Sequence, residues 1–156
     1  MKFTKPLLVL AMASLSLAAC ARYNGEDRGK PMMPNQVNAK WQAECSGCHM
    51  AYPPGLLPAA SWKKIMSGLD KHFGTDASLS PADTAEISAF LVANPSNRWS
   101  SSAAPLRTTE SEWFRVKHGE ISAAVFARAS VKSKSNCVAC HSGAANGDFD
   151  DRTIPK

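Results

Sequence analysis

After its first twenty residues, the sequence has no long apolar run, no low-complexity stretch, and no segment in which apolar and polar residues alternate as in a β-strand. These absences exclude a polytopic membrane protein and a collagen-like chain, and they argue against a sheet-based fold. The 156 residues, 44% of them hydrophobic, suffice for one or two small domains with a hydrophobic core. We therefore expect a mostly α-helical protein with long loops.

The excess of positive charge is small. The chain has 18 Lys+Arg and 13 Asp+Glu, a formal net charge of +5. Lys2 and Lys5 belong to a segment that we expect to be removed, which leaves 16 basic residues and a net charge of +3. A balance of this size does not require a nucleic-acid partner, and we expect none.

Residues 1–19 have the features of an export signal. Lys2 and Lys5 precede an apolar run over residues 7–13, and small residues follow. The run is too short to span a membrane comfortably. Residues 17–20 (Leu-Ala-Ala-Cys) resemble a bacterial lipobox, in which Cys20 becomes the lipidated first residue, and this would explain the odd fifth cysteine. The alternative is ordinary cleavage after Ala19 or Ala21. We expect a periplasmic protein, anchored by lipid if the lipobox is real.

The other four cysteines form two C-x-x-C-H motifs, over residues 45–49 and 137–141. This is the attachment signature of c-type haem. Two thiols at this spacing can form thioethers to the two vinyl groups of one porphyrin, and the following histidine then lies under the iron as proximal ligand. The motifs predict two covalently attached haem c groups. Their sites would be formed by Cys45, Cys48 and His49, and by Cys137, Cys140 and His141.

Three other interpretations use the same cysteines. A four-cysteine zinc site would also need two C-x-x-C pairs, but it does not need a histidine after each, and 88 residues separate Cys48 from Cys137. A thioredoxin-like dithiol would be expected in a βαβ unit, and no such pattern is visible. A structural disulfide within each pair is compatible with an oxidising compartment. The presence of a histidine directly after each cysteine pair favours haem over these alternatives.

The two remaining histidines, His72 and His118, match the number of axial ligands that two six-coordinate irons would still need. Residues 61–74 predict a helix with Ser61 as N-cap and Gly74 after its end, which places His72 on the apolar stripe. Residues 109–112 resemble a capping box that opens a second helix, ending at His118. A hydrogen-bonded core residue for His72 and a solvated helix-end charge for His118 are the alternatives to ligation.

The ligand pairing is open at this stage. His72 follows His49 by 23 residues, and His118 precedes His141 by 23, so the simplest scheme joins each motif to its nearer histidine. A crossed scheme is also sterically possible. Methionine is the rival ligand, with Met66 on the His72 stripe and residues 32–33 upstream. Bis-imidazole ligation favours ferric iron, so we expect two low-potential, low-spin haems.

The proposed domain boundaries follow composition. We predict a flexible tether over 20–35, an N-terminal haem domain over 36–95, a Ser/Pro-rich linker over 96–108, and a C-terminal haem domain over 109–156. Within the first domain we predict short helices over 38–48 and from Ser80-Pro81 to Ala93. Each half is small for independent folding, so covalent haem would supply much of its apolar core.

These motifs make the chain similar to the small proteobacterial dihaem cytochromes c. The resemblance rests on W-x-x-E-C-x-x-C-H-x-A-Y-P-P and the I-M-x-G-L-x-x-H-F-G segment in the first half, and on residues 135–149 in the second. It implies a mostly α fold, an electron-transfer role, and His49, His72, His118 and His141 as iron ligands. It also implies two partners, a membrane cytochrome b and a small oxygen-binding monohaem cytochrome.

The expected function is therefore an electron carrier with no catalytic residues, because saturated irons offer no open position to a substrate. The four haem propionates would bring the net charge to about −1, so the basic composition is no guide to partners. The alternative is a small dihaem redox enzyme or reductase subunit in which one haem opens a coordination site. A haem-based sensor ranks last, because nothing resembles an output domain.

Overall fold

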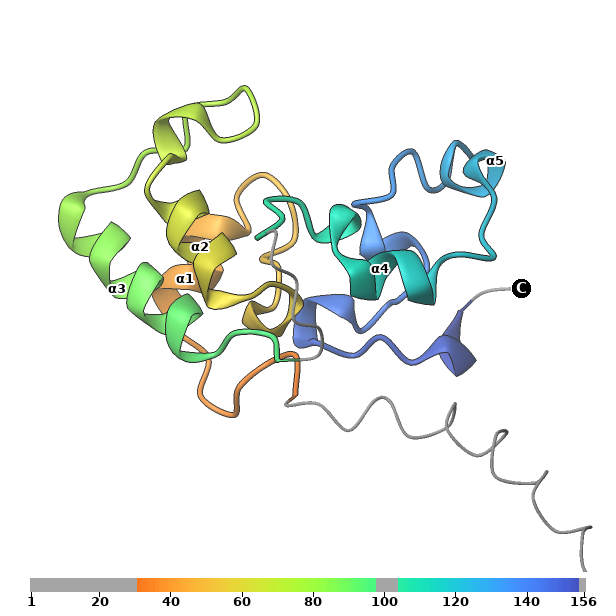
Figure 1. Ribbon diagram of the computed structural model, residues 1–156, viewed down its shortest axis with the longest axis horizontal. Helices are drawn as coiled ribbons and strands as arrows, with labels where there is room; N and C mark the ends of the chain where they lie inside the picture. The colour runs from red at the N-terminus through yellow and green to blue at the C-terminus, as the bar shows by residue number, and fades with distance from the viewer. Residues whose placement is uncertain (1–30, 98–103, 155–156) are drawn as a thin grey trace, which may run out of the picture.

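The structure is a computed structural model that describes residues 31–97 and 104–154. Those residues form short α-helices and 3-10 turns without a β-strand, as the sequence predicts. Figure 1 shows α1, α2 and α3 in one half, and α4 and α5 in the other. The α-helices are α1 (Ala39–Cys45), α2 (Ala59–Met66), α3 (Pro81–Ala93), α4 (Glu112–Lys117) and α5 (Ala123–Phe126). The 3-10 turns are η1 (Pro54–Leu56), η2 (Leu69–Lys71), η3 (Thr108–Glu110), η4 (Cys137–Ala139), η5 (Ala144–Asn146) and η6 (Asp151–Thr153). Within the described residues, no helix is long and apolar enough to cross a membrane.

Helix α3 organises the first half, where it packs against α1, α2 and η1. The side chain of Ser80 caps its N-terminus by accepting a hydrogen bond from the Asp83 amide, and Pro81 occupies the first helical position. The helix ends before Asn94. These three features confirm the predicted segment. Its buried face joins α1 and α2 in a core of seven residues: Trp41, Ala51, Leu57, Trp62, Met66, Ile87 and Leu91.

Helix α2 is shorter than predicted. It begins after Pro58 and ends at Met66, so Ser61 is not its N-cap. The chain leaves the helical conformation at Gly68 and continues into η2. A glycine inside a helix destabilises it by about 1 kcal/mol relative to alanine. At Gly68 the backbone leaves the helix and forms a turn. His72 therefore follows a 3-10 turn rather than lying on the apolar stripe of a continuous helix.

The second half has fewer buried side chains. Of its apolar residues in the described part of the chain, Phe114, Val131 and Ala144 are buried. Helix α4 begins two residues later than the predicted capping box implies, because residues 108–110 form the separate turn η3. Ser111 is its N-cap and accepts a hydrogen bond from the Phe114 amide at 3.1 Å. The helix ends at Lys117 with His118 as its C-cap, which places His118 at the helix end as predicted.

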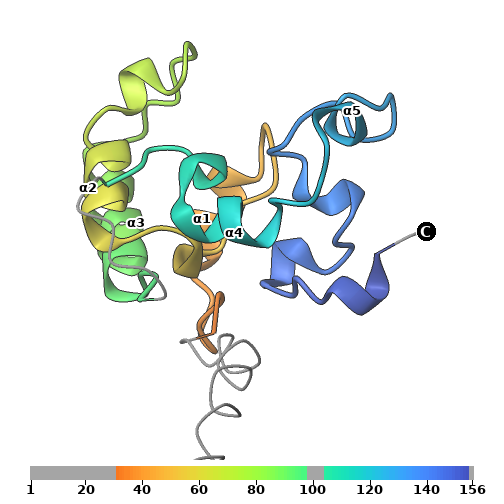
Figure 2. The same cartoon turned by 45° about the vertical axis from the view of Figure 1, so that its right-hand side comes forward.

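The beginning of the described chain packs against both halves. Met32 is buried, and its carbonyl accepts a hydrogen bond from the Gly55 amide at 2.9 Å. Gly147 has a φ of +78°, and a Cβ there would lie 2.9 Å from the Cβ of Met33, so only glycine fits this approach. The packed chain thus begins before residue 36. Figure 2 shows α2 and α3 on one side of the molecule and α5 on the other. The predicted signal, Cys20, tether residues 20–30 and linker residues 98–103 lie outside the described residues.

Candidate haem sites

The first C-x-x-C-H motif begins at the end of α1. The side chain of Asn38 caps this helix by accepting a hydrogen bond from the Trp41 amide at 2.7 Å, and the helix ends at Cys45. Cys45 is half-buried, whereas Cys48 and His49 are exposed. The position of α1 in the first half therefore determines where the first attachment cysteine lies.

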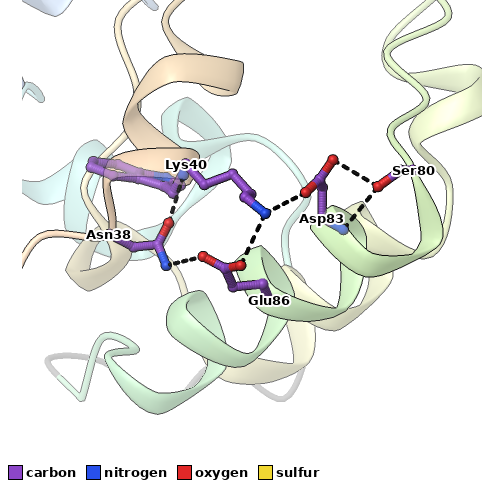
Figure 3. Close-up of polar contacts among 6 residues, drawn as sticks. Asn38, Lys40, Ser80, Asp83 and Glu86 are labelled. Atoms are coloured by element: carbon purple, nitrogen blue, oxygen red, sulfur yellow. Dashed lines mark hydrogen bonds and ion pairs between the residues drawn. The ribbon is translucent and has the colours of Figure 1, made fainter.

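A polar network holds α1 on α3, as Figure 3 shows. Lys40 forms ion pairs with Asp83 and Glu86, the second at 3.1 Å, and Asn38 donates a hydrogen bond to Glu86 at 2.9 Å. The pKa of Asp83 is lowered mainly by Lys40 and also by Ser80. The pKa of Glu86 is lowered by its hydrogen bond from Asn38 and by Lys40. These groups are at least partly exposed to solvent, so the network orients the helix more than it stabilises the fold.

His49 and His72 face each other at the first motif. Their ring centroids are 6.2 Å apart with an interplanar angle of 28°. His49 Nδ1 donates to the carbonyl of Met50 at 2.7 Å, which leaves Nε2 as the free nitrogen. A tight turn presents His72, because the Thr75 amide donates to the His72 carbonyl at 3.0 Å. Phe73 in this turn has a φ of +50°, a strained conformation for a non-glycine residue.

His118 and His141 form the second pair. Their ring centroids are also 6.2 Å apart, with the planes almost perpendicular at 86°. His118 Nδ1 donates to the Phe114 carbonyl at 3.0 Å, and the two rings stack at 4.0 Å. His141 follows η4 and its amide donates to the Cys137 carbonyl at 2.8 Å. Thus each predicted distal histidine lies beside the histidine of the nearer motif.

The spacing of both pairs fits an iron held between two imidazoles. A metal–imidazole nitrogen bond is about 2 Å long, so two rings on opposite sides of one metal have centroids about 6 Å apart. Both pairs show 6.2 Å. Among the described residues, no ring contact joins a histidine of one pair to a histidine of the other. The geometry therefore fits the nearer pairing and not the crossed one.

A structural disulfide and a zinc site receive no support from the described residues. Cys45, Cys48, Cys137 and Cys140 are all free thiols. In the part of the chain that the structure describes, no group of three or more His, Cys, Asp or Glu side chains could hold a metal ion by itself. The arrangement thus differs from a Cys₄ zinc site, which needs four convergent ligands. Burial raises the pKa of Cys45 and of Cys137 to about 11, so both thiols are protonated at neutral pH.

The distal histidines are electrostatically suited to bind a metal. Burial, followed by the neighbouring His49 and Arg107, lowers the pKa of His72. Burial also lowers the pKa of His118, against the opposing effect of its hydrogen bond to Phe114. Both shifts favour the neutral imidazole, which is the form that ligates metals.

Apolar side chains close to the distal histidines in sequence are exposed. Phe73, whose ring contacts that of His72, is 47% exposed, and Val116 and Ile121, two and three residues from His118 in sequence, are 46% and 43% exposed. The buried Nδ1 of His141 has no hydrogen-bond partner. A large apolar cofactor between the rings would cover such side chains. The residues at both sites therefore fit a porphyrin.

The structure adds contacts that the sequence analysis missed. The ring of Tyr52 lies 5.0 Å from that of His49, and its hydroxyl donates to the Ser135 carbonyl at 2.8 Å. The Arg107 guanidinium lies over the Phe73 ring at 4.2 Å. The first contact joins the two halves, and the second joins the end of the predicted linker to the first half. The Y-P-P loop after the first motif signalled a rigid segment at Tyr52, but no local pattern pairs it with residue 135.

Comparison with known proteins gives consistent results. The family model described as "Dihaem cytochrome c" matches residues 41–149. A dihaem cytochrome c structure from Rhodobacter sphaeroides is 42% identical, with a TM-score of 0.65 over 72% of this chain and 97% of the other. A second structure from that organism is 45% identical, with a TM-score of 0.65 over 73% and 98% of the two chains. A dihaem cytochrome from Shewanella baltica OS155 is 41% identical, with a TM-score of 0.67 over 75% and 90%. The comparison with curated proteins gives no match.

Proposed function

The chain belongs to the dihaem cytochrome c family, and on this premise we propose that it carries electrons between a membrane-bound donor, such as a cytochrome b, and an acceptor in the periplasm. The observation that carries this proposal is the presence of two histidine pairs, each with ring centroids 6.2 Å apart beside a C-x-x-C-H motif. The pairs supply what a saturated haem iron needs: one imidazole on each side.

Members of this family hold two covalently attached haem c groups, and the two cysteine pairs of this chain fit that attachment. We assign Cys45 and Cys48 to one haem and Cys137 and Cys140 to the other. When bound, each haem supplies a one-electron ferric/ferrous couple. The protein contributes the axial ligands, their orientation, and the apolar surroundings that set the potential.

We assign His49 and His72 to the first iron, and His141 and His118 to the second. The hydrogen bonds from His49 Nδ1 and His118 Nδ1 to backbone carbonyls fix the tautomer in which Nε2 is the ligating atom. Two histidines on each iron would leave no site for a substrate, which favours a carrier over an enzyme. Two imidazoles also favour ferric iron, so we expect low potentials.

The export signal over residues 1–19 and the cysteine at position 20 support a periplasmic protein anchored by lipid. A small monohaem c-type cytochrome is the expected periplasmic partner, by the resemblance of this chain to its family. Labelling cells with radioactive palmitate tests the anchor. We expect label on the wild-type protein and none on the Cys20→Ala variant, and an unlabelled wild-type protein would contradict lipidation.

The carrier function is tested on the purified, exported holoprotein. We expect two haems per chain in the pyridine haemochrome assay and rapid reduction and reoxidation by one-electron mediators. We also expect no carbon monoxide binding by the ferrous protein, and no turnover of hydrogen peroxide above that of a bis-histidine cytochrome control. Stoichiometric carbon monoxide binding, or peroxide turnover, would instead show a haem with an open position and support the enzyme alternative.

A further inference from the structure

Tyr52 lies where the two halves meet at their haem sites. It follows the first C-x-x-C-H motif by three residues, and its half-buried ring is 5.0 Å from the ring of His49 with an interplanar angle of 45°. Its hydroxyl donates a 2.8 Å hydrogen bond to the carbonyl of Ser135, 83 residues away. One side chain therefore contacts a proposed ligand of the first haem and the segment that leads into the second motif.

The accepting carbonyl has a second partner that haem attachment would remove. The Cys137 thiol donates to the same Ser135 carbonyl at 3.6 Å. When Cys137 becomes a thioether, it loses the hydrogen that it donates in this contact. The Tyr52 hydroxyl then remains as the side-chain donor to the Ser135 carbonyl, two residues before the attachment cysteine.

Tyr52 is also held rigidly. Pro53 and Pro54 follow it, both are fully buried, and the φ of each is fixed by its ring. The adjoining turn η1 packs against α3. A tyrosine side chain has only two rotatable angles, so it links two segments at a low cost in conformational entropy. This link therefore fixes the position of Ser135, in the second half, relative to the first half.

We propose that Tyr52 is a positioning residue for electron exchange between the two haems, through its hydrogen bond to the Ser135 carbonyl. The proposal rests on the proposed function. In the exchange, one electron leaves the ferrous iron of one half and reduces the ferric iron of the other, and no bond forms or breaks. The rate of such a step falls steeply as the separation of the two cofactors grows. A contact that fixes the two attachment segments therefore sets the rate.

The test uses the dihaem holoprotein and the Tyr52→Phe variant, which keeps the ring against His49 and removes the hydroxyl. Exchange between the haems is measured in the half-reduced protein by NMR exchange spectroscopy or flash photoreduction. We expect a several-fold slower exchange, with two low-spin haems retained. Ser67→Ala is the matched control, because it also deletes a hydroxyl that donates to a carbonyl, that of Lys64 at 3.0 Å, within one half. We expect the control to exchange at the wild-type rate.

The outcomes separate the two proposals. Wild-type exchange in Tyr52→Phe together with slower exchange in Tyr52→Leu would show that only ring packing matters and would overturn the role of the hydroxyl. If Tyr52→Phe retains fewer than two haems, p-aminophenylalanine at position 52 restores an N–H donor. Recovery of exchange with that residue supports the proposal, and no recovery overturns it. A wild-type protein without two low-spin haems would instead contradict the proposed function.

Discussion

The imidazole of His118 stacks on the ring of Phe114, with centroids 4.0 Å apart and planes 15° from parallel, and its Nδ1 donates to the carbonyl of the same residue at 3.0 Å. Both contacts arise because the two residues are four apart on α4 and its C-cap, where side chains lie above one another. Phe114 therefore fixes the plane of this imidazole and its tautomer. The His49–Met50 hydrogen bond gives the first site a comparable fixed tautomer.

Phe114→Leu keeps an apolar side chain but removes the stacked ring. The loss of an aromatic contact is worth about 1 kcal/mol, so we expect two attached haems and a modest loss of stability. The Nδ1 hydrogen bond of His118 to the backbone carbonyl of residue 114 remains, but the plane of the imidazole is less restricted without the stacked ring. This should broaden the low-spin EPR signal of one haem and leave that of the other unchanged. The g values of both haems, measured at low temperature, check this. Unchanged signals from both haems would contradict a positioning role for Phe114.

The two halves should respond differently to the loss of their haem. The first has a core of seven buried residues, whereas the second buries few apolar side chains of its own. Replacing Cys137 and Cys140 with alanine should leave one haem and unfold the second half, which limited proteolysis would detect as cleavage after residue 104. Replacing Cys45 and Cys48 with alanine should remove the first haem. In that variant α1–α3 should resist proteolysis better than the second half does in the Cys137/Cys140 variant. Equal resistance of both halves would contradict the account.

Ile87 tests the core of the first half. Its side chain is fully buried on α3, in the core that also contains Trp41 from α1. We expect Ile87→Ala to lower the free energy of unfolding by about 2–5 kcal/mol, and Ile87→Val by about 0.5–1.5 kcal/mol. Guanidinium denaturation followed by circular dichroism gives both values. Similar losses for the two variants would show that the cavity, and hence the tight packing of α3, is not the cause.

The Lys40 network predicts a small pH dependence. The pKa values of Asp83 and Glu86 are lowered in the folded chain, so their contribution to stability is present above their ordinary values near 4. It is lost as the pH falls through the folded pKa values. In Lys40→Gln the fall in melting temperature between pH 6 and pH 3, about the range that spans these pKa values, should be shallower. An identical fall in both proteins, at low ionic strength, would contradict the contribution of Lys40.

The features of the structure that the sequence predicts correctly are those that short, local sequence patterns determine. The C-x-x-C-H motifs and the Ser80-Pro81 start of α3 are local patterns. The first leads to the family, and the second correctly predicts where a helix begins. The single helix predicted over 61–74 is wrong, because the apolar periodicity continues past Gly68 although the backbone does not. Periodicity reports which side chains are apolar and cannot report where a chain turns.

Local patterns also misplaced the start of one helix, and they gave no information on contacts between segments that are distant in the sequence. The predicted capping box at 109–112 is wrong in register, because Ser111 rather than Thr109 caps α4. The histidine count predicted four ligands but left the pairing open, and the 6.2 Å separations now favour one pairing. Nothing near Tyr52 in the sequence indicates Ser135 as its partner, since that contact depends on how the halves pack.

The central claim is that His72 and His118 each complete a different iron. Low-temperature EPR of the ferric His72→Ala and His118→Ala holoproteins, read beside the wild type, tests it most directly. The account predicts two low-spin signals in the wild type. In each variant it predicts one retained low-spin signal and one high-spin signal, with a different haem affected in each. Two unchanged low-spin signals in either variant, or the same haem affected in both, would contradict it.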